Sequence, residues 1–107
     1  MSLSTHVLDA GTGRPASGVV VGLHRGERLI AEGVTGEDGR LNDWLPGGEP
    51  GAGVHRLVFH TGAYFAARGV RTFYPEVVVT FTVEDPGEHH HVPLLLSPFA
   101  YSTYRGS

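Results

Sequence analysis

Hydrophobic and polar residues alternate along most of the chain with a period of two, which is typical of β-strands with one buried face. Turn signals rich in Gly, Pro and Asp separate these runs at residues 11–15, 36–39 and 85–87. So many short strands with close turns predict an all-β, antiparallel sandwich. Strands are expected over residues 3–10, 18–25, 28–35, 40–41, 54–60, 76–83, 89–96 and 99–105.

Two segments interrupt this alternation. Residues 61–69 predict the one helix, with Thr61 as its N-cap, alanines in its interior and Gly69 where the C-terminal cap belongs. Residues 46–53 read PGGEPGAG and predict an irregular loop, because Gly and Pro dominate them.

The period of two also assigns side chains to faces, because residues two apart on a strand point the same way. The residues expected in the core are Leu3, Thr5, Val7, Val92, Leu94, Leu96, Phe99, Tyr101 and Thr103. The residues expected on the outer face are Ser4, His6, Leu8, His89, His91, Pro93, Leu95, Ala100, Ser102 and Tyr104. An outer face with this many apolar side chains is unusual in contact with water, so we expect it to be an oligomer contact.

Composition narrows the classes of function. A chain of 107 residues predicts one domain, residues 1–107, and a net charge of −3 gives no basic surface for nucleic acid or an anionic membrane. No apolar stretch is long enough for a membrane span, and the first twenty residues do not resemble a secretory signal, so a cytoplasmic protein is expected. The chain has no Cys and no Lys, which excludes thiolate and Schiff-base chemistry.

The remaining candidates for chemistry are histidines and arginines. The run His89-His90-His91 is a possible metal site, but only His89 and His91 share a face and no Cys or Glu-x-x-His completes a ligand set, so we expect no metal. Arg40 follows a turn, where it is either functional or a solvated charge. The last four residues would ordinarily be a frayed end.

Four segments resemble the 5-hydroxyisourate hydrolase family, and together they run over the whole chain. They are residues 4–9 (STHVLD), 38–41 (DGRL), 91–98 (HVPLLLSP) and 101–107 (YSTYRGS), of which the last is the most specific. The hormone carrier transthyretin shares the fold and the LLSP stretch, but lacks the His, Arg and YRGS set and is the more distant likeness.

The resemblance implies a prealbumin-like (transthyretin) sandwich of two four-stranded sheets with one short helix. It implies a homotetramer whose sites lie in a channel at the dimer–dimer interface, with no metal and no cofactor. Its catalytic residues match His6, Arg40, His91 and Ser107, and its substrate contacts match His6, Arg40, His91, Tyr104 and Arg105. The family more often has Tyr at position 90. We expect His90 to point away from the channel, so this difference should affect packing more than chemistry.

The implied activity is hydrolysis of 5-hydroxyisourate to 2-oxo-4-hydroxy-4-carboxy-5-ureidoimidazoline, a step of urate degradation in purine catabolism. The expected mechanism is direct attack of water on the ring amide, positioned and deprotonated by His6 and His91, with Arg40 on the ureide oxygens. The sequence leaves open which His is the base, and whether Ser107 acts through its hydroxyl or its carboxylate. A covalent role for Ser107 is disfavoured because no Ser-His-Asp arrangement is evident. The alternatives are a non-catalytic carrier of a small aromatic ligand in the tetramer channel and a module that only mediates protein contacts.

Overall fold

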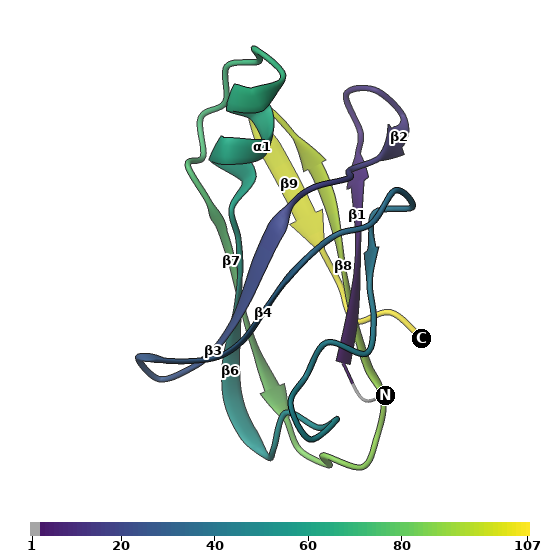
Figure 1. Ribbon diagram of the computed structural model, residues 1–107, viewed down its shortest axis with the longest axis vertical. Helices are drawn as coiled ribbons and strands as arrows, with labels where there is room; N and C mark the ends of the chain where they lie inside the picture. The colour runs from purple at the N-terminus through teal and green to yellow at the C-terminus, as the bar shows by residue number, and fades with distance from the viewer. Residues whose placement is uncertain (1–2) are drawn as a thin grey trace.

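Two β-sheets pack face to face around the apolar positions of the alternating pattern, in a computed structural model that describes residues 3–107 (Figure 1). The first sheet has the order β2-β1-β8-β9, with β5 also paired to β1, and the second has the order β4-β3-β6-β7. The elements are β1 (Leu3–Asp9), β2 (Arg14–Pro15), β3 (Val20–Arg25), β4 (Arg28–Val34), β5 (Arg40–Leu41), β6 (Gly53–Phe59), α1 (Thr61–Ala67), β7 (Val77–Val83), β8 (His90–Ser97) and β9 (Ala100–Thr103).

The prediction of a two-sheet β-sandwich with one short helix is confirmed, with two corrections to the pairing. β1 and β8 run parallel, so the sandwich is not purely antiparallel. This is possible because β1 and β8 are far apart in the sequence and need no tight turn between them. The two-residue strands β2 and β5 both pair with β1, which gives the first sheet five strands.

The assignment of faces is confirmed for β1 and β8. All six residues that were assigned to the core on these strands are buried: Leu3, Thr5, Val7, Val92, Leu94 and Leu96. The same assignment is wrong for Phe99 and Tyr101, whose side chains are 62% and 41% exposed, and for Thr103, which is also exposed. β9 is a short strand at the edge of its sheet, and all four of its residues are exposed.

The N-cap of the helix lies one residue earlier than expected. His60 is the N-cap, and Thr61 lies inside the helix as a buried residue, so the prediction of Thr61 as N-cap is wrong. The reason is that β6 leads almost directly into the helix, and the His60 N–H still donates to the carbonyl of Val20 on β3 at 2.9 Å. Gly69 follows the C-cap with φ +66°, which is the left-handed position that glycine favours at a helix end.

A buried carboxylate fastens the helix to the first sheet. The Asp9 Oδ1 atom accepts hydrogen bonds from the N–H groups of Gly11 and Thr12, and Oδ2 accepts one from the Tyr64 hydroxyl at 2.8 Å. Burial raises the pKa of Tyr64 to about 12, and Asp9 contributes to this rise. Arg68 lies over the Tyr64 ring at 3.8 Å. The hydrogen bond from Tyr64 to Asp9 joins α1 to the end of β1.

We expect Tyr64→Phe to lower the free energy of unfolding by about 2 kcal/mol, because it removes a hydrogen bond to a buried charged acceptor. Urea denaturation followed by circular dichroism measures this change. Tyr101→Phe is the matched control, since its side chain is 41% exposed and the aromatic contact with Tyr74 survives the substitution. Equal stability of Tyr64→Phe and the wild type would contradict the role assigned to this hydrogen bond.

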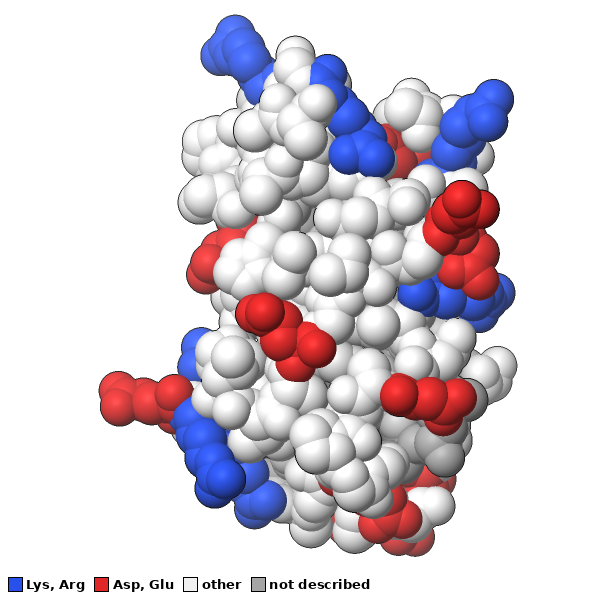
Figure 2. All heavy atoms as spheres, viewed as in Figure 1, with Lys and Arg blue, Asp and Glu red and all other residues white. Residues whose placement is uncertain are grey.

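Charged side chains are dispersed over the face in Figure 2, where Arg residues lie among acidic and uncharged neighbours and do not gather into one patch. Within residues 3–107, no helix has the length and apolar character to cross a membrane.

Candidate active site

A turn before β5 delivers Arg40 next to His6. The two residues are opposite one another in the antiparallel pairing of β1 and β5. Gly39 precedes Arg40 with φ +74°, and its carbonyl accepts a hydrogen bond from the Val7 N–H at 2.8 Å. A Cβ at Gly39 would collide with the Val7 backbone, so glycine is required for β5 to approach β1 this closely.

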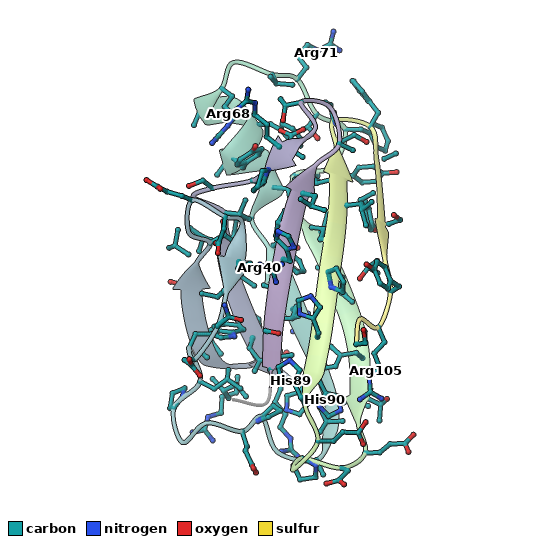
Figure 3. All side chains as sticks on the ribbon, turned by 90° about the vertical axis from the view of Figure 1, so that its right-hand side faces the viewer. Arg40, Arg68, Arg71, His89, His90 and Arg105 are labelled. Atoms are coloured by element: carbon teal, nitrogen blue, oxygen red, sulfur yellow. The ribbon has the colours of Figure 1, made fainter. Side chains whose placement is uncertain are left out.

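His91 lies on the other side of β1, on β8. The parallel register pairs it with Ser4, and the Ser4 Oγ atom is 2.7 Å from His91 Nδ1. The same Oγ atom is 3.1 Å from Nε2 of His89, and the two imidazole rings are stacked with centroids 6.5 Å apart. Figure 3 looks onto this sheet, with Arg40 beside β1 and His89 near the start of β8. The structure therefore gathers His6, Arg40 and His91, as predicted from strand parity and the family motifs.

The surroundings of His91 favour its neutral form. Burial lowers the pKa of His91 below its usual value of 6.5, and the positive charge of Arg40, His89 and His6 lowers it further. A hydrogen bond to the Ser4 backbone acts in the opposite direction. An imidazole that is neutral at physiological pH can accept a proton, which is what a general base requires.

His6 differs from His91 in how its ring is held. Its Nε2 atom is 2.9 Å from the Asp38 carbonyl oxygen. A carbonyl only accepts, so Nε2 of His6 carries the proton and donates it to this bond. The bond ties His6 to the turn that carries Arg40, and it leaves Nδ1 as the nitrogen of the neutral His6 ring that can accept a proton.

The last residues run back across β8 to His91. The Gly106 N–H donates to the His91 carbonyl at 2.8 Å, and a Cβ at Gly106 would lie 2.5 Å from the ring atom Cδ2 of His91. Arg105 forms an ion pair with Glu88 and donates to the His89 carbonyl at 3.3 Å. The segment is therefore held at His91 of β8 and at Glu88 and His89 just before this strand, unlike the frayed end that terminal residues ordinarily form.

The terminal residues that were expected to contact substrate are placed differently from one another. Tyr104 lies one residue beyond β9, is 60% exposed and lines a shallow hollow with Phe81 and Val92. The guanidinium of Arg105 is directed to Glu88. Ser107 follows Gly106 and is exposed. Their contacts with substrate stay predictions.

Ser4 is the residue of this cluster that sequence reasoning missed. It was assigned to the outer face with His89 and His91, but no role was attached to it. Its side chain is only 3% exposed, and it bridges both rings. The signal was present in the alternation, but the contact depends on the parallel register of β1 and β8, which periodicity does not give.

Two further expectations concern the histidine run. His90 is buried, unlike His89 and His91, and its Nδ1 atom has no hydrogen-bond partner among residues 3–107. Its burial agrees with the expectation that it points away from the outer face. Within the same described part of the chain, no group of three His, Asp or Glu residues is arranged to hold a metal ion.

Residues 3–106 match the model of the HIUase/Transthyretin family. The chain belongs to this family. A family member named 5-hydroxyisourate hydrolase, from Salmonella typhimurium, is 45% identical over 98% of this chain and 80% of its own length. The structure of 5-hydroxyisourate hydrolase from Klebsiella pneumoniae superposes with a TM-score of 0.91, at 39% identity over 99% of this chain and 93% of that one.

Transthyretin also resembles this chain in fold. Sea bream transthyretin in complex with thyroxine superposes with a TM-score of 0.90, at 31% identity over 99% of this chain and 95% of that one. The likeness of fold therefore does not by itself separate the hydrolases of the HIUase/Transthyretin family from its transthyretins.

Proposed function

We propose that this protein is a hydrolase that opens the ring of 5-hydroxyisourate and releases 2-oxo-4-hydroxy-4-carboxy-5-ureidoimidazoline, in the degradation of urate. The observation that carries the proposal is the gathering of His6, Arg40 and His91 on one face of the first sheet. The family members that are about 45% identical to this chain and are named for this hydrolysis support the same conclusion.

His91 acts as the general base. A water molecule attacks the carbonyl carbon of the ring amide, and Nε2 of His91 takes its proton as the new carbon–oxygen bond forms. The lowered pKa of His91 keeps this ring neutral at physiological pH, so the proton acceptor is present in most molecules. The hydrogen bond between His6 and the Asp38 carbonyl gives His6 a positioning role toward substrate.

Arg40 stabilises the charge that develops during the attack. Its planar guanidinium presents several N–H donors to the oxygen atoms of the ureide and to the oxyanion. When the carbon–nitrogen bond breaks, the imidazolium of His91 returns its proton to the departing nitrogen, and the new carboxylic acid on the carbon side then loses its remaining proton to solvent. The Gly106 hydrogen bond to His91 supports a place for Ser107 beside this reaction, where its hydroxyl can donate to substrate. Contacts of Tyr104 and Arg105 with substrate require both side chains to turn from the hollow beside Phe81 and from Glu88.

The experiment that tests this function is direct. Purified protein is added to 5-hydroxyisourate freshly generated by urate oxidation, and the decay of the ultraviolet absorbance is followed. Acceleration well above the spontaneous rate is the expected result. Decay at the spontaneous rate in the presence of folded protein would contradict the proposal.

The same outer face forms the contact between dimers of a homotetramer in this proposal. Leu8 and Leu95 are half-buried there, and they would be covered by a second copy of the sheet. Light scattering is expected to give a mass about four times the 11.4 kDa of one chain. A monomer with full activity would contradict a site that is shared between subunits.

The titration of His91 is a further prediction. In an NMR titration, its midpoint is expected below pH 6.5, because burial and the neighbouring cations disfavour the charged ring. Arg40→Gln removes a positive charge, which stabilises the imidazolium and should move the midpoint upward. Arg71→Gln is the matched control, because Arg71 lies at the far end of the molecule in Figure 3. A midpoint that Arg40→Gln does not raise would contradict the proximity of these two groups.

The alternative function is a carrier that binds a small aromatic ligand without converting it. It is favoured by the similarity to sea bream transthyretin, which was solved in complex with thyroxine. Binding of thyroxine by a protein without activity toward 5-hydroxyisourate would support the carrier. The cluster of His6, Arg40 and His91 favours the hydrolase, because hydrophobic ligand binding does not require a proton acceptor beside a guanidinium.

A further inference from the structure

The terminal segment, residues 104–107, is held at two successive residues. The Arg105 guanidinium forms an ion pair with Glu88 and donates to the His89 carbonyl at 3.3 Å. The next residue, Gly106, donates its N–H to the His91 carbonyl at 2.8 Å, in an isolated antiparallel bridge. Figure 3 shows Arg105 at the same end of the first sheet as His89. The segment therefore runs along the start of β8 as far as His91.

The close fit at Gly106 makes the position of this segment matter for the proposed site. A Cβ at Gly106 would lie 2.5 Å from Cδ2 of His91 and 3.3 Å from Cγ of Pro93, so the backbone passes directly against both side chains. Ser107 is bonded to Gly106, so the place of its hydroxyl and of its carboxylate depends on where Gly106 lies. A residue that holds Gly106 in place therefore acts on Ser107 without touching substrate.

Arg105 is fastened to the residues just before β8. A single guanidinium nitrogen, Nη2, contacts both the Glu88 carboxylate and the His89 carbonyl. Glu88 lies in the connection between β7 and β8. Glu84, the other glutamate of this connection, forms no ion pair within residues 3–107. The pairing with Glu88 thus fixes the residue that immediately precedes Gly106.

We propose that Glu88 and Arg105 form an anchor that holds Gly106 and Ser107 against His91, so that both are positioning residues for the hydrolysis. The inference rests on the function proposed above, because it specifies how the terminal residues of that site are held. It gives Arg105 a different role from the substrate contact that the family resemblance implies. The side chains of Arg105 and Glu88 are 57% and 56% exposed, so the anchor is weak and is screened by salt.

Glu88→Gln removes the charge of the anchor and keeps a side chain of nearly the same shape. We expect kcat/KM for 5-hydroxyisourate to fall about two- to fivefold, because an exposed ion pair shifts an equilibrium by up to about this factor. Glu84→Gln is the matched control. It removes an exposed carboxylate from the same connection and should keep the wild-type rate.

Salt dependence distinguishes an ionic anchor from a change of shape. At about 1 M salt the screening length is only about 3 Å, so the ion pair is weakened in the wild type. The ratio of kcat/KM between the wild type and Glu88→Gln should therefore fall toward one as salt is raised. A ratio that does not change with salt would contradict an anchor based on charge.

Variants of Arg105 separate an anchor from a substrate contact. Arg105→Lys keeps the charge that pairs with Glu88 but lacks the planar fork that binds the oxygens of a ureide, and it should stay within about twofold of the wild type. Arg105→Gln should match Glu88→Gln, and the double variant should lose no more than either single variant, because all three remove the same interaction. A loss in Arg105→Gln more than about tenfold beyond that of Glu88→Gln would overturn the anchor and assign Arg105 to substrate.

Backbone NMR tests the anchor independently of activity. The ¹H–¹⁵N heteronuclear NOE reports motion on the ps–ns timescale, and in the wild type the amides of Gly106 and Ser107 should have values close to those of β8. Glu88→Gln should lower the values at these two amides, whereas Glu84→Gln should leave them unchanged.

The outcomes distinguish the two proposals. Mobile amides at Gly106 and Ser107 in the wild type, or a Glu88→Gln variant with unchanged NOE values and kcat/KM, would overturn the anchor while hydrolysis stands. A terminal segment whose order depends on Glu88, in a protein without activity toward 5-hydroxyisourate, would leave the anchor in place and refute the proposed function.

Discussion

His91→Ala is expected to lower kcat/KM for 5-hydroxyisourate by about 10³-fold, which is typical of the loss of a general base. The substitution removes the proton acceptor and leaves Arg40 and the rest of the face in place. The fold should persist, because His91 is only half-buried and lies on the outer face of β8, opposite Val92 of the core. The residual activity would come from orientation and charge stabilisation by Arg40.

The measurement is the initial rate of absorbance decay at several substrate concentrations, with circular dichroism to verify folding. His24→Ala is the matched control, since His24 is a half-buried strand histidine on β3 of the second sheet. This control should keep the wild-type rate. If His91→Ala kept wild-type kcat/KM while folded, and His6→Ala and Arg40→Gln did too, the proposed site would be wrong.

The alternation of apolar and polar residues along β1 and β8 was enough to predict which of their residues face the core and which face outward. Leu3 and Val7 on one strand and Leu94 on the other are buried as the period of two predicted. The same period placed His6 and His91 on the opposite face, and both lie there. This inference succeeds because one face of each strand is covered by the second sheet, so a shift by one residue would expose the whole apolar set.

The alternating pattern does not predict which strands pair with one another, so it does not predict side-chain contacts between strands. The bridge from Ser4 to two histidines depends on the parallel pairing of β1 with β8, and the sequence pattern favoured an antiparallel sandwich. The pairing of Arg40 with His6 likewise depends on how the turn at Gly39 meets β1. Such contacts are long-range, and they follow from the packing of the whole sandwich rather than from local propensity.

At the edge of the sheet and beyond its last strand, the period of two does not predict which side chains are buried. Tyr101 has the pattern of a core residue, yet it is exposed because β9 has no neighbour beyond it. Tyr104 lies past the last paired residue, so strand parity does not determine its direction. The position of Gly106 against His91 arises from an isolated bridge, for which the sequence carries no periodic signal.

Gly106→Ala is expected to lower kcat/KM by about 10²-fold with little change in melting temperature. The added Cβ would lie 2.5 Å from His91 Cδ2 and 3.3 Å from Pro93 Cγ, so either the ring or the terminal segment must move. The ring is held by the 2.7 Å bond to Ser4, and moving it gives up that bond. A displacement of about 1 Å at a catalytic group is enough for a loss of this size.

The stability of this variant should change little, because the terminal segment is anchored by an exposed ion pair between Arg105 and Glu88, which contributes less than about 1 kcal/mol. Gly87→Ala is the matched control. Its Cβ would meet only Asp85 Oδ1, at 3.3 Å, and the rate should stay at the wild-type value. Wild-type kcat/KM in Gly106→Ala would show that the terminus does not constrain His91.

Deletion of residues 104–107 then separates two ways in which the terminus can act. The deleted protein has no Cβ atom next to His91, so the His91 ring is not displaced by a collision. If Gly106→Ala lowers activity only because its Cβ displaces His91, the deleted protein should keep most of its activity. We expect instead a loss comparable to that of Gly106→Ala, because Ser107 and the Gly106 hydrogen bond to the His91 carbonyl are lost with the segment. A folded, fully active deletion variant would confine the site to His6, Arg40 and His91.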